Sequence, residues 1–482
     1  MPPPDTPLTR RLGREHVLLT GATGFLGGVV LEKLLRLTPG GEPVFVLLRP
    51  RPGRTARERL HRLMRSPVLR RLRESEGITD EELDRRLVPV PGDLHQKDLG
   101  LEAGFRRRLQ DQVSAVLHCA ADCDFDAPLD DALRTNVLGA RSVLALARDA
   151  GDVPLVHVST AFVYGAGGEP VPEAVLGPPA HRNDPPEASA FDPLAHTHHL
   201  LSQVHEVRDA HPSSATRRAR LMSVRAARDL AWGNAYTLSK GLGEMVLQQE
   251  HGRVPLRIVR PSIIEPSAVD PFPGWIDRSR NLSAFMVEVA LGRLPVVPGR
   301  PGAALDVIPV DRVANAVLTS LPDPDDAGSF SVHHAVAGEE GAVRIGDLVR
   351  WMADALSEGA TTLPGEPRPE TMPLLEPDEL DGLLRDRIRE LRAQGSPEAR
   401  REARIQLRIR QMTRLYEPFL TARHRLERTR LDRLQAGLAP ADRALFPLGT
   451  ADLDWSRYVA EAWLPAIQRL VTEAGTPRAV AP

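Results

Sequence analysis

The chain has 482 residues, of which 42% are apolar and 26% are charged, and its formal net charge is −2. A chain this apolar is not intrinsically disordered, and its balanced charge gives no electrostatic case for binding nucleic acid. The length suggests two domains, or one large domain with an appendage. Only three lysines are present (Lys33, Lys97 and Lys240) and only four tyrosines, so each copy is expected to have a specific place.

The two cysteines, Cys119 and Cys123, stand four positions apart. They form neither a disulfide framework nor a structural zinc site, so a reducing cytoplasm is the expected location. Residues 1–13 lack the apolar stretch of a signal peptide and are expected to form a polar tail. No apolar run approaches the length of about 18 residues that a membrane span needs, which leaves only peripheral membrane contact open.

Short apolar runs alternate with amphipathic segments from residue 14 to about residue 340. Residues 16–20 and 43–48 are apolar runs, and between them residues 25–37 carry apolar side chains at helical spacing, which together indicate a βαβ unit. Further strands are expected at 88–90, 115–118, 155–158 and 256–259, with helices over 129–148 and 236–249. Fully apolar strands in this alternation predict a Rossmann-type, doubly wound parallel sheet with helices on both faces.

Two regions depart from this alternation. Residues 166–232 form an insertion, which begins as a Pro- and Gly-rich loop and continues as a polar helical segment over 196–231. Residues 341–482 are expected to form a mainly helical C-terminal domain, with a linker at 358–377.

A glycine-rich turn follows the first expected strand, with Gly21, Gly24 and Gly27 spaced three apart. The first glycine permits the tight turn, the second lets the backbone approach a pyrophosphate, and the third lets the helix pack on the sheet. The helix N-terminus then offers N–H groups to the phosphates. Because a strand precedes the motif and an amphipathic helix follows it, we interpret it as a dinucleotide-binding turn.

Arg49 stands at the end of the second expected strand, where an NAD-binding fold would have an acidic residue. A guanidinium there suits the 2′-phosphate of NADPH, the alternative being a solvated loop charge. Asp93 follows the third strand and would accept a hydrogen bond from the adenine amino group, unless it only forms a turn. The complete set of expected cofactor contacts is Gly21, Thr23, Gly24, Phe25, Leu26, Gly27, Arg49, Arg59, Asp93, Leu94, Ala120, Tyr236 and Lys240.

Tyr236 and Lys240 are four residues apart at the start of an expected helix, so they share one face. A free phenol is too weak an acid at neutral pH, and a nearby ammonium group would lower its pKa. Tyr236 would then protonate an oxygen that gains charge as hydride arrives, while Lys240 holds the nicotinamide ribose. Thr160, after the fifth strand, is the expected second donor to that oxygen, with Ser159 as the alternative.

Four stretches are similar to the alcohol-forming fatty acyl-CoA reductases of the male sterility type, within the extended short-chain dehydrogenase/reductase superfamily. They are the glycine turn with VFVLLRP, where Arg49 and Arg59 match NADPH contacts; PGDLHQKDL with HCAADCDFD; HVSTAFVYG with YTLSK; and LRIVRPSIIEPSAVDPFPGW. The resemblance covers residues 14–335, and the tail from Tyr416 onward resembles the C-terminal domain of that family more loosely.

The resemblance implies NADPH-dependent reduction of a long-chain fatty acyl-CoA to a primary alcohol through an aldehyde, with release of coenzyme A. The catalytic residues would be Thr160, Tyr236 and Lys240, and no metal site is expected. One alternative is a thioester reductase that releases aldehyde from a carrier-bound acyl chain. A second is a non-catalytic NADP-binding regulatory protein, although such a protein would be expected to lack the tyrosine or the lysine. The sequence does not define the oligomeric state.

The expected insertion is rich in arginine, with Arg217, Arg218, Arg220 and Arg225 close together. These side chains would meet the phosphates of coenzyme A or an anionic membrane surface, or they simply form a solvated helix face.

Overall fold

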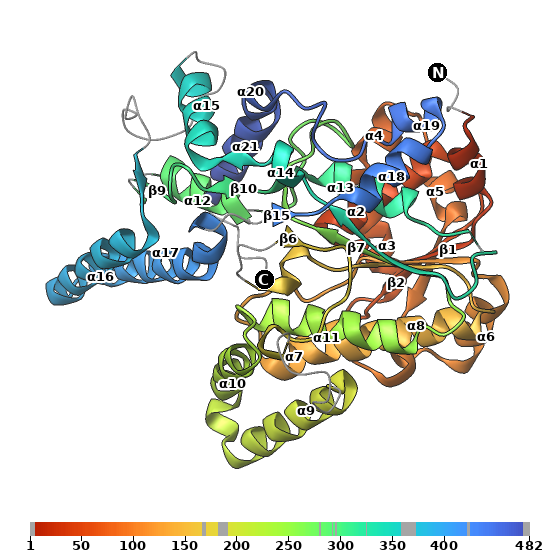
Figure 1. Ribbon diagram of the computed structural model, residues 1–482, viewed down its shortest axis with the longest axis horizontal. Coiled ribbons are helices and arrows are strands. Elements are labelled where there is room, and N and C mark those ends of the chain that lie inside the picture. The colour runs from red at the N-terminus through yellow and green to blue at the C-terminus, as the bar shows by residue number, and fades with distance from the viewer. Residues whose placement is uncertain are drawn as a thin grey trace.

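The computed structural model describes residues 5–165, 170–181, 191–278, 281–291, 293–294, 296–323, 325–357, 373–421 and 425–475. Its centre is a seven-stranded parallel sheet with the order β12-β7-β5-β4-β1-β2-β3 (Figure 1). The strands are β1 (Val17–Thr20), β2 (Val44–Leu48), β3 (Leu87–Pro91), β4 (Ala115–His118), β5 (Leu155–Val158), β7 (Leu256–Pro261) and β12 (Phe330–Ala335). The strand order reverses between β1 and β4, as in dinucleotide-binding sheets, and the predicted Rossmann-type fold is confirmed.

Helices cover both faces of this sheet. Helices α2 (Phe25–Leu37) and α13 (Val310–Thr319) lie together on one face, and α8 (Ala140–Asp149) and α11 (Ala235–Glu250) lie on the other (Figure 1). The helix expected over 129–148 is interrupted, because a π-helical segment (Arg134–Gly139) separates α7 (Leu129–Leu133) from α8. That segment contains Asn136, whose amide bonds to Asp122 and to Ser239, so the interruption joins a loop to α11.

The sequence predicts a polar tail at residues 1–13. The second half of this segment instead forms the helix α1 (Pro7–Gly13). A capping box formed by Thr6 and Thr9 starts the helix, with proline at its first position. Leu8 and Leu12 are buried, and the Leu8 amide donates to the carboxylate of Asp442 over 3.3 Å. Two leucines four residues apart on one helical face were enough to dock the segment.

The described part of the expected insertion at 166–232 contains a two-helix hairpin, α9 (Pro193–Ala210) and α10 (Ala215–Asp229). Its apolar side chains pack on α11 in one buried cluster. A short strand, β6 (Pro170–Val171), pairs with β15 (Arg425–Leu426), which joins this region to the C-terminal part. Residues 166–169 and 182–190 of the insertion lie outside the described residues.

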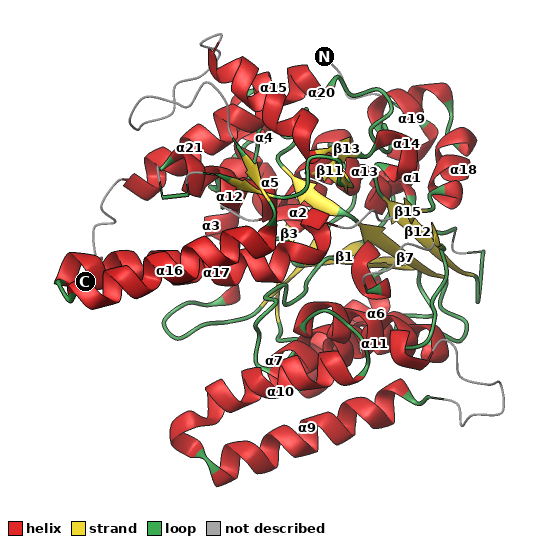
Figure 2. Ribbon diagram, turned by 60° about the vertical axis from the view of Figure 1, so that its left-hand side comes forward, coloured by secondary structure: helices red, strands yellow, loops and turns green. Residues whose placement is uncertain are grey.

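The described residues after β12 are mainly helical, as expected. Helices α16 (Pro377–Gln394) and α17 (Pro397–Thr421) form a hairpin that projects from the body (Figures 1 and 2). The remaining helices are α14 (Gly338–Gly341), α15 (Ile345–Ser357), α18 (Thr429–Gly437), α19 (Pro440–Leu445), α20 (Trp455–Tyr458) and α21 (Leu464–Gly475). One apolar cluster runs from the α2 and α13 face of the sheet into α15 and α21. The expected domain limit at 340/341 falls at the end of α14, and most of the expected linker at 358–377 lies outside the described residues.

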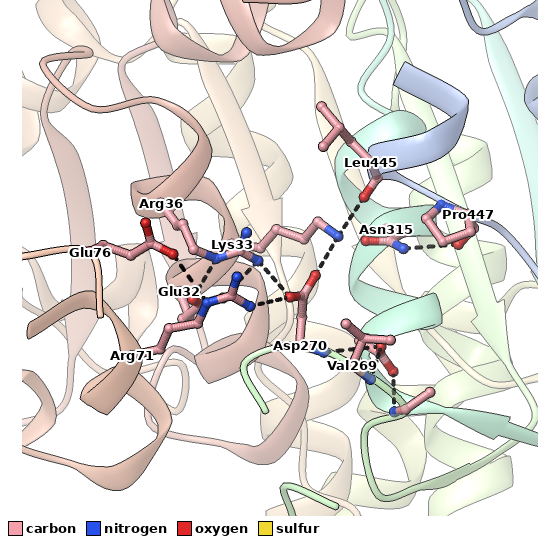
Figure 3. Close-up of polar contacts among 12 residues, drawn as sticks. Glu32, Lys33, Arg36, Arg71, Glu76, Val269, Asp270, Asn315, Leu445 and Pro447 are labelled. Atoms are coloured by element: carbon pink, nitrogen blue, oxygen red, sulfur yellow. Dashed lines mark hydrogen bonds and ion pairs between the residues drawn. The ribbon is translucent and has the colours of Figure 1, made fainter. Parts of the chain in front are cut away.

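A largely buried group of charges fastens α2 to Asp270, which lies between β7 and β12 in the chain, and to Leu445 near the C-terminus (Figure 3). The carboxylate of Asp270 receives Lys33 at 2.9 Å, Arg36 at 2.9 Å and Arg71 at 2.7 Å. The Lys33 ammonium also donates to the carbonyl of Leu445, 2.8 Å away. Burial acts to raise the pKa of Asp270, but the three cations prevail and lower it to about 2.

We expect Asp270→Asn to lower the free energy of unfolding in urea by about 3 kcal/mol, because it leaves three cations facing an uncharged partner. The matched control is Asp347→Asn, which removes an exposed ion pair with Arg350 and should cost less than about 0.5 kcal/mol. Because the pKa of Asp270 is depressed when folded, its contribution is present above the ordinary value of 3.8 and is lost as pH falls toward 2. Equal effects of the two substitutions would contradict this account.

Candidate active site

The expected cofactor turn lies where β1 and β4 end side by side, with Thr20 paired to His118 in the sheet. Gly21 has a φ of +79°, and a Cβ there would lie 2.6 Å from the amide nitrogen of Ala120. A Cβ at Gly27 would lie 2.3 Å from the Gly21 carbonyl oxygen. The turn, the start of α2 and the end of β4 can therefore approach this closely only because Gly21 and Gly27 lack side chains.

The helix that follows the turn is shaped to receive an anion. Gly24 is the N-cap of α2, and no side chain caps this helix end. Its first-turn amides are of the kind that phosphates bind, and a Cβ at Gly24 would meet only the Gly21 carbonyl oxygen, at 3.2 Å. Phe25 and Leu26 have buried side chains in the core, so only their backbones can serve a cofactor, while Thr23 is exposed beside them.

Three arginines gather beyond β2. Arg59, on α3 (Ala56–Met64), donates to the carbonyl of Arg49. Burial lowers the pKa of Arg59, and the positive charges of Arg51 and Arg49 lower it further. Asp93, after β3, accepts from the amide of His95 at 3.0 Å, and its carboxylate lies 3.9 Å from Arg49. Such a concentration of guanidinium groups favours a phosphate ligand.

The remaining expected contacts lie at the same edge of the sheet. The amide of Ala120 donates to the hydroxyl of Thr20 over 3.2 Å at the end of β4. Leu94 follows β3 and lies against Gly139, where an added Cβ would meet it at 2.9 Å. The structure therefore brings the ends of β1 to β4 together as the sequence predicts, and the role of each residue stays a prediction.

Tyr236 and Thr160 meet at the end of β5. Tyr236 lies in the first turn of α11, which Asn234 caps by accepting from the amide of Thr237 at 2.9 Å. The Tyr236 hydroxyl hydrogen-bonds with Thr160, whose side chain is buried. Ser159 is also buried, but its hydroxyl has no hydrogen-bond partner within the described part of the chain. Of the two expected donors, Thr160 is therefore the one that contacts the phenol.

The prediction that Lys240 lowers the pKa of Tyr236 is wrong. Burial raises the pKa of Tyr236 well above its ordinary value of 10, and the hydrogen bond from Thr160 offsets this only partly. The Lys240 ammonium instead donates to the carbonyl of Val158 at 2.6 Å and lies 3.1 Å from the Nε2 atom of His157. A lysine four residues away shares the helical face, but its long side chain reaches past the phenol to the strand end.

Two neutral histidines lie beneath Lys240. Burial lowers the pKa of His157 well below its ordinary value and that of His118 to about 3, and the lysine charge adds to both effects. The two rings are tilted against each other, with centroids 5.0 Å apart. Burial also lowers the pKa of Lys240 to about 8, so at neutral pH the charge of this trio resides on the lysine. The neutral ring of His157 supplies an acceptor that keeps the ammonium group buried.

Three further residues near Tyr236 are not found by sequence reasoning. The Cys123 side chain hydrogen-bonds with Tyr236, and the Phe125 ring stacks on the Tyr236 ring with centroids 5.8 Å apart. Phe125 also contacts Tyr416 of α17, at 5.3 Å. The position of HCAADCDFD after a strand end could have indicated Cys123 and Phe125, whereas nothing local indicated Tyr416. Burial raises the pKa of the Cys119 thiol to about 12, which disfavours a thiolate nucleophile at this position.

The sheet order and the glycine turn are those of a Rossmann-type dinucleotide-binding fold, the class to which this protein belongs. Solved structures agree in fold: the terminal R domain of the myxalamid PKS-NRPS pathway has a TM-score of 0.61, 22% identity, and coverage of 96% of this chain and 92% of that one. The reductase domain of a nonribosomal peptide synthetase from Mycobacterium tuberculosis has a TM-score of 0.56 and 20% identity, and the match covers 97% of this chain and 96% of that one.

Sequence comparisons define the family. Residues 19–317 match the family model described as male sterility protein. Fatty acyl-CoA reductase 1 of Arabidopsis thaliana is 30% identical over 70% of this chain and 69% of its own length. Fatty acyl-CoA reductase 1 of Gallus gallus is 33% identical over 64% of this chain, and the match spans only 54% of that relative. The chain belongs to the male sterility family, that of the fatty acyl-CoA reductases.

We expect Gly27→Ala to weaken binding of the oxidised and reduced nicotinamide dinucleotides by about tenfold or more, because its Cβ would push against the backbone of Gly21 and reshape the turn. The matched control is Gly28→Ala in the same helical turn. The nearest atoms to its Cβ would be the methyl groups of Val68 at 3.3 Å and the carbonyl oxygen of Ala22 at 3.4 Å. Fluorescence titration measures both affinities, and an equal loss in the two variants would contradict the cradle.

Proposed function

We propose that the protein reduces long-chain fatty acyl-CoA to a primary fatty alcohol, with NADPH as the reductant and an aldehyde as the intermediate. Family membership supports the substrate class. The observation that carries the proposal is the contact between Tyr236 and Thr160 at the strand end that faces the expected nicotinamide site. Two hydroxyl groups that lie side by side can both donate hydrogen bonds to a substrate oxygen that gains negative charge during reduction.

The first reduction converts a thioester to an aldehyde and a free thiol. The nicotinamide would supply a hydride to the thioester carbonyl carbon. Thr160 and Tyr236 donate hydrogen bonds to the oxygen, which becomes negatively charged, and the resulting hemithioacetal then collapses with loss of the coenzyme A thiolate. That thiolate takes up a proton. In the second reduction a second NADPH, bound after the oxidised cofactor has left, would supply the hydride for the aldehyde carbon, and Tyr236 protonates the oxygen to give the alcohol and recovers its own proton from solvent.

The raised pKa of Tyr236 bears on this role. The phenol keeps its proton at neutral pH and can donate a hydrogen bond to the substrate oxygen, and it gives up that proton only when the oxygen has become strongly basic. Lys240 keeps most of its positive charge at neutral pH with a pKa of about 8, and it lies one helical turn from the phenol. Its position at the end of β5 suits binding of the nicotinamide ribose.

The arginine group beyond β2 supports NADPH as the reductant. Arg49, Arg51 and Arg59 lie close enough for the first two to lower the pKa of the third. A 2′-phosphate would relieve this repulsion and accept charge-assisted hydrogen bonds. The ribose hydroxyls of NADH would offer no comparable charge.

Purified protein with NADPH and palmitoyl-CoA should oxidise two NADPH for each coenzyme A thiol released and form the alcohol. A ratio of one would identify an aldehyde-releasing reductase instead.

Tyr236→Phe should lower turnover by about 100-fold or more and keep NADPH affinity. The matched control, Tyr458→Phe, loses a hydroxyl bonded to the Pro266 carbonyl and should retain turnover. Unchanged turnover in Tyr236→Phe would disprove the catalytic assignment.

We expect Arg59→Ser to raise the dissociation constant for NADPH by roughly 10- to 100-fold and that for NADH by less than about threefold, since only NADPH carries the charged 2′ group. Arg57→Ser, an exposed position on the same helix, is the control and should leave both constants unchanged. Equal weakening of NADPH and NADH in the Arg59 variant would mean that this arginine shapes the loop and does not select the cofactor.

A further inference from the structure

Helix α10 carries apolar side chains on its outward face. Leu221 and Val224 are each 61% exposed, and they lie between Arg217 and Arg228 on one stripe of the helix. Large apolar side chains this exposed are few among the described residues, and α10 is the only element there that carries two of them. We call the stripe formed by Arg217, Leu221, Val224 and Arg228 the α10 face.

The α10 face is strongly basic. The helix contains five arginines and one acidic residue, Asp229, which lies 3.6 Å from Arg225. Within the described part of the chain, the guanidinium groups of Arg217 and Arg228 have no ion-pair or hydrogen-bond partner. Basic side chains around exposed apolar ones are the pattern of helices that lie in the interface of an anionic bilayer.

The opposite side of α10 is attached to the loop beside the candidate active site. Ser223 is buried and donates to the carbonyl of Ala127 over 2.7 Å, and Arg220 lies 3.7 Å from Asp126. Phe125 in the same loop stacks on Tyr236. The hairpin of α9 and α10 projects from the body below α11 (Figure 2). A surface bound to the α10 face would therefore lie one helix thickness from the loop that contacts the phenol.

We propose that the α10 face docks the protein on an anionic lipid bilayer, with Leu221 and Val224 inserted among the headgroups and Arg217 and Arg228 bound to lipid phosphates. Within the described residues no helix is long and apolar enough to cross a bilayer. The charge favours an anionic surface, and the exposed apolar pair favours a lipid one. The inference rests on the proposed function for its purpose, because long acyl chains concentrate in membranes.

The test is sedimentation of the full chain, without cofactor or substrate, with vesicles of phosphatidylcholine alone and of phosphatidylcholine and phosphatidylglycerol in equal parts. Wild-type protein should sediment with the anionic vesicles only, and high salt should release it. The double variant Leu221→Ser with Val224→Ser should bind about tenfold more weakly. Arg217→Gln with Arg228→Gln should bind about 25-fold more weakly, at roughly fivefold for each charge.

The matched control is Leu383→Ser, which removes a side chain 59% exposed on α16 and should bind vesicles as wild-type protein does. All variants should reduce a short, water-soluble aldehyde at the wild-type rate in vesicle-free buffer, which separates loss of docking from failure of the proposed function. Wild-type binding by the α10 variants, or loss of binding in the Leu383 variant alone, would overturn the proposal. The proposal would also be overturned if the protein did not bind vesicles and sedimentation velocity showed that it self-associates through α10.

Discussion

The hydrogen bond from the buried Lys240 ammonium to the Val158 carbonyl is the contact on which the candidate site depends. A charged group this deep needs hydrogen-bond partners, and here the strand carbonyl and the neutral ring of His157 accept from two of its three donors. The bond fixes the start of α11 over the end of β5. Tyr236, one turn earlier on the same face, is thereby held beside Thr160. A displacement of α11 along the sheet would separate the two hydroxyl groups.

The C-terminal part completes this site and does not merely follow it. Lys33 joins α2 to Leu445, and Asn315 on α13 donates to the carbonyl of Pro447, so the chain after β12 is fastened to the helices that cover the sheet (Figure 3). Tyr416 on α17 then reaches Phe125, which lies on the Tyr236 ring. The environment of the phenol is therefore built from segments nearly 300 positions apart.

The features that sequence reasoning predicts well are those that local physics decides. The helix at 25–37 and the strands at 115–118 and 155–158 have the predicted bounds, because apolar periodicity and flanking turns define them. The glycine turn and the pairing of Tyr236 with a polar group after β5 follow from strand topology. The predicted direction of the pKa shift of Tyr236 was wrong. Spacing on a helix shows which residues share a face, but it does not show which group a long side chain reaches. Tyr416 could not be found, since its contact is set by tertiary packing alone.

The scarcity of lysine and tyrosine was itself informative. In an arginine-rich chain, two of the three lysines are buried, Lys33 at the ion-pair group and Lys240 at the strand end. A compact ammonium group fits a site that combines a carbonyl with one further acceptor. A planar guanidinium suits a carboxylate to which two of its nitrogens can donate, as Arg312 donates to both oxygens of Asp452. All four tyrosines are likewise engaged: Tyr164 and Tyr458 donate to carbonyls, and Tyr236 and Tyr416 flank Phe125. Rare residues therefore mark the points where this fold is held together and where its chemistry is expected.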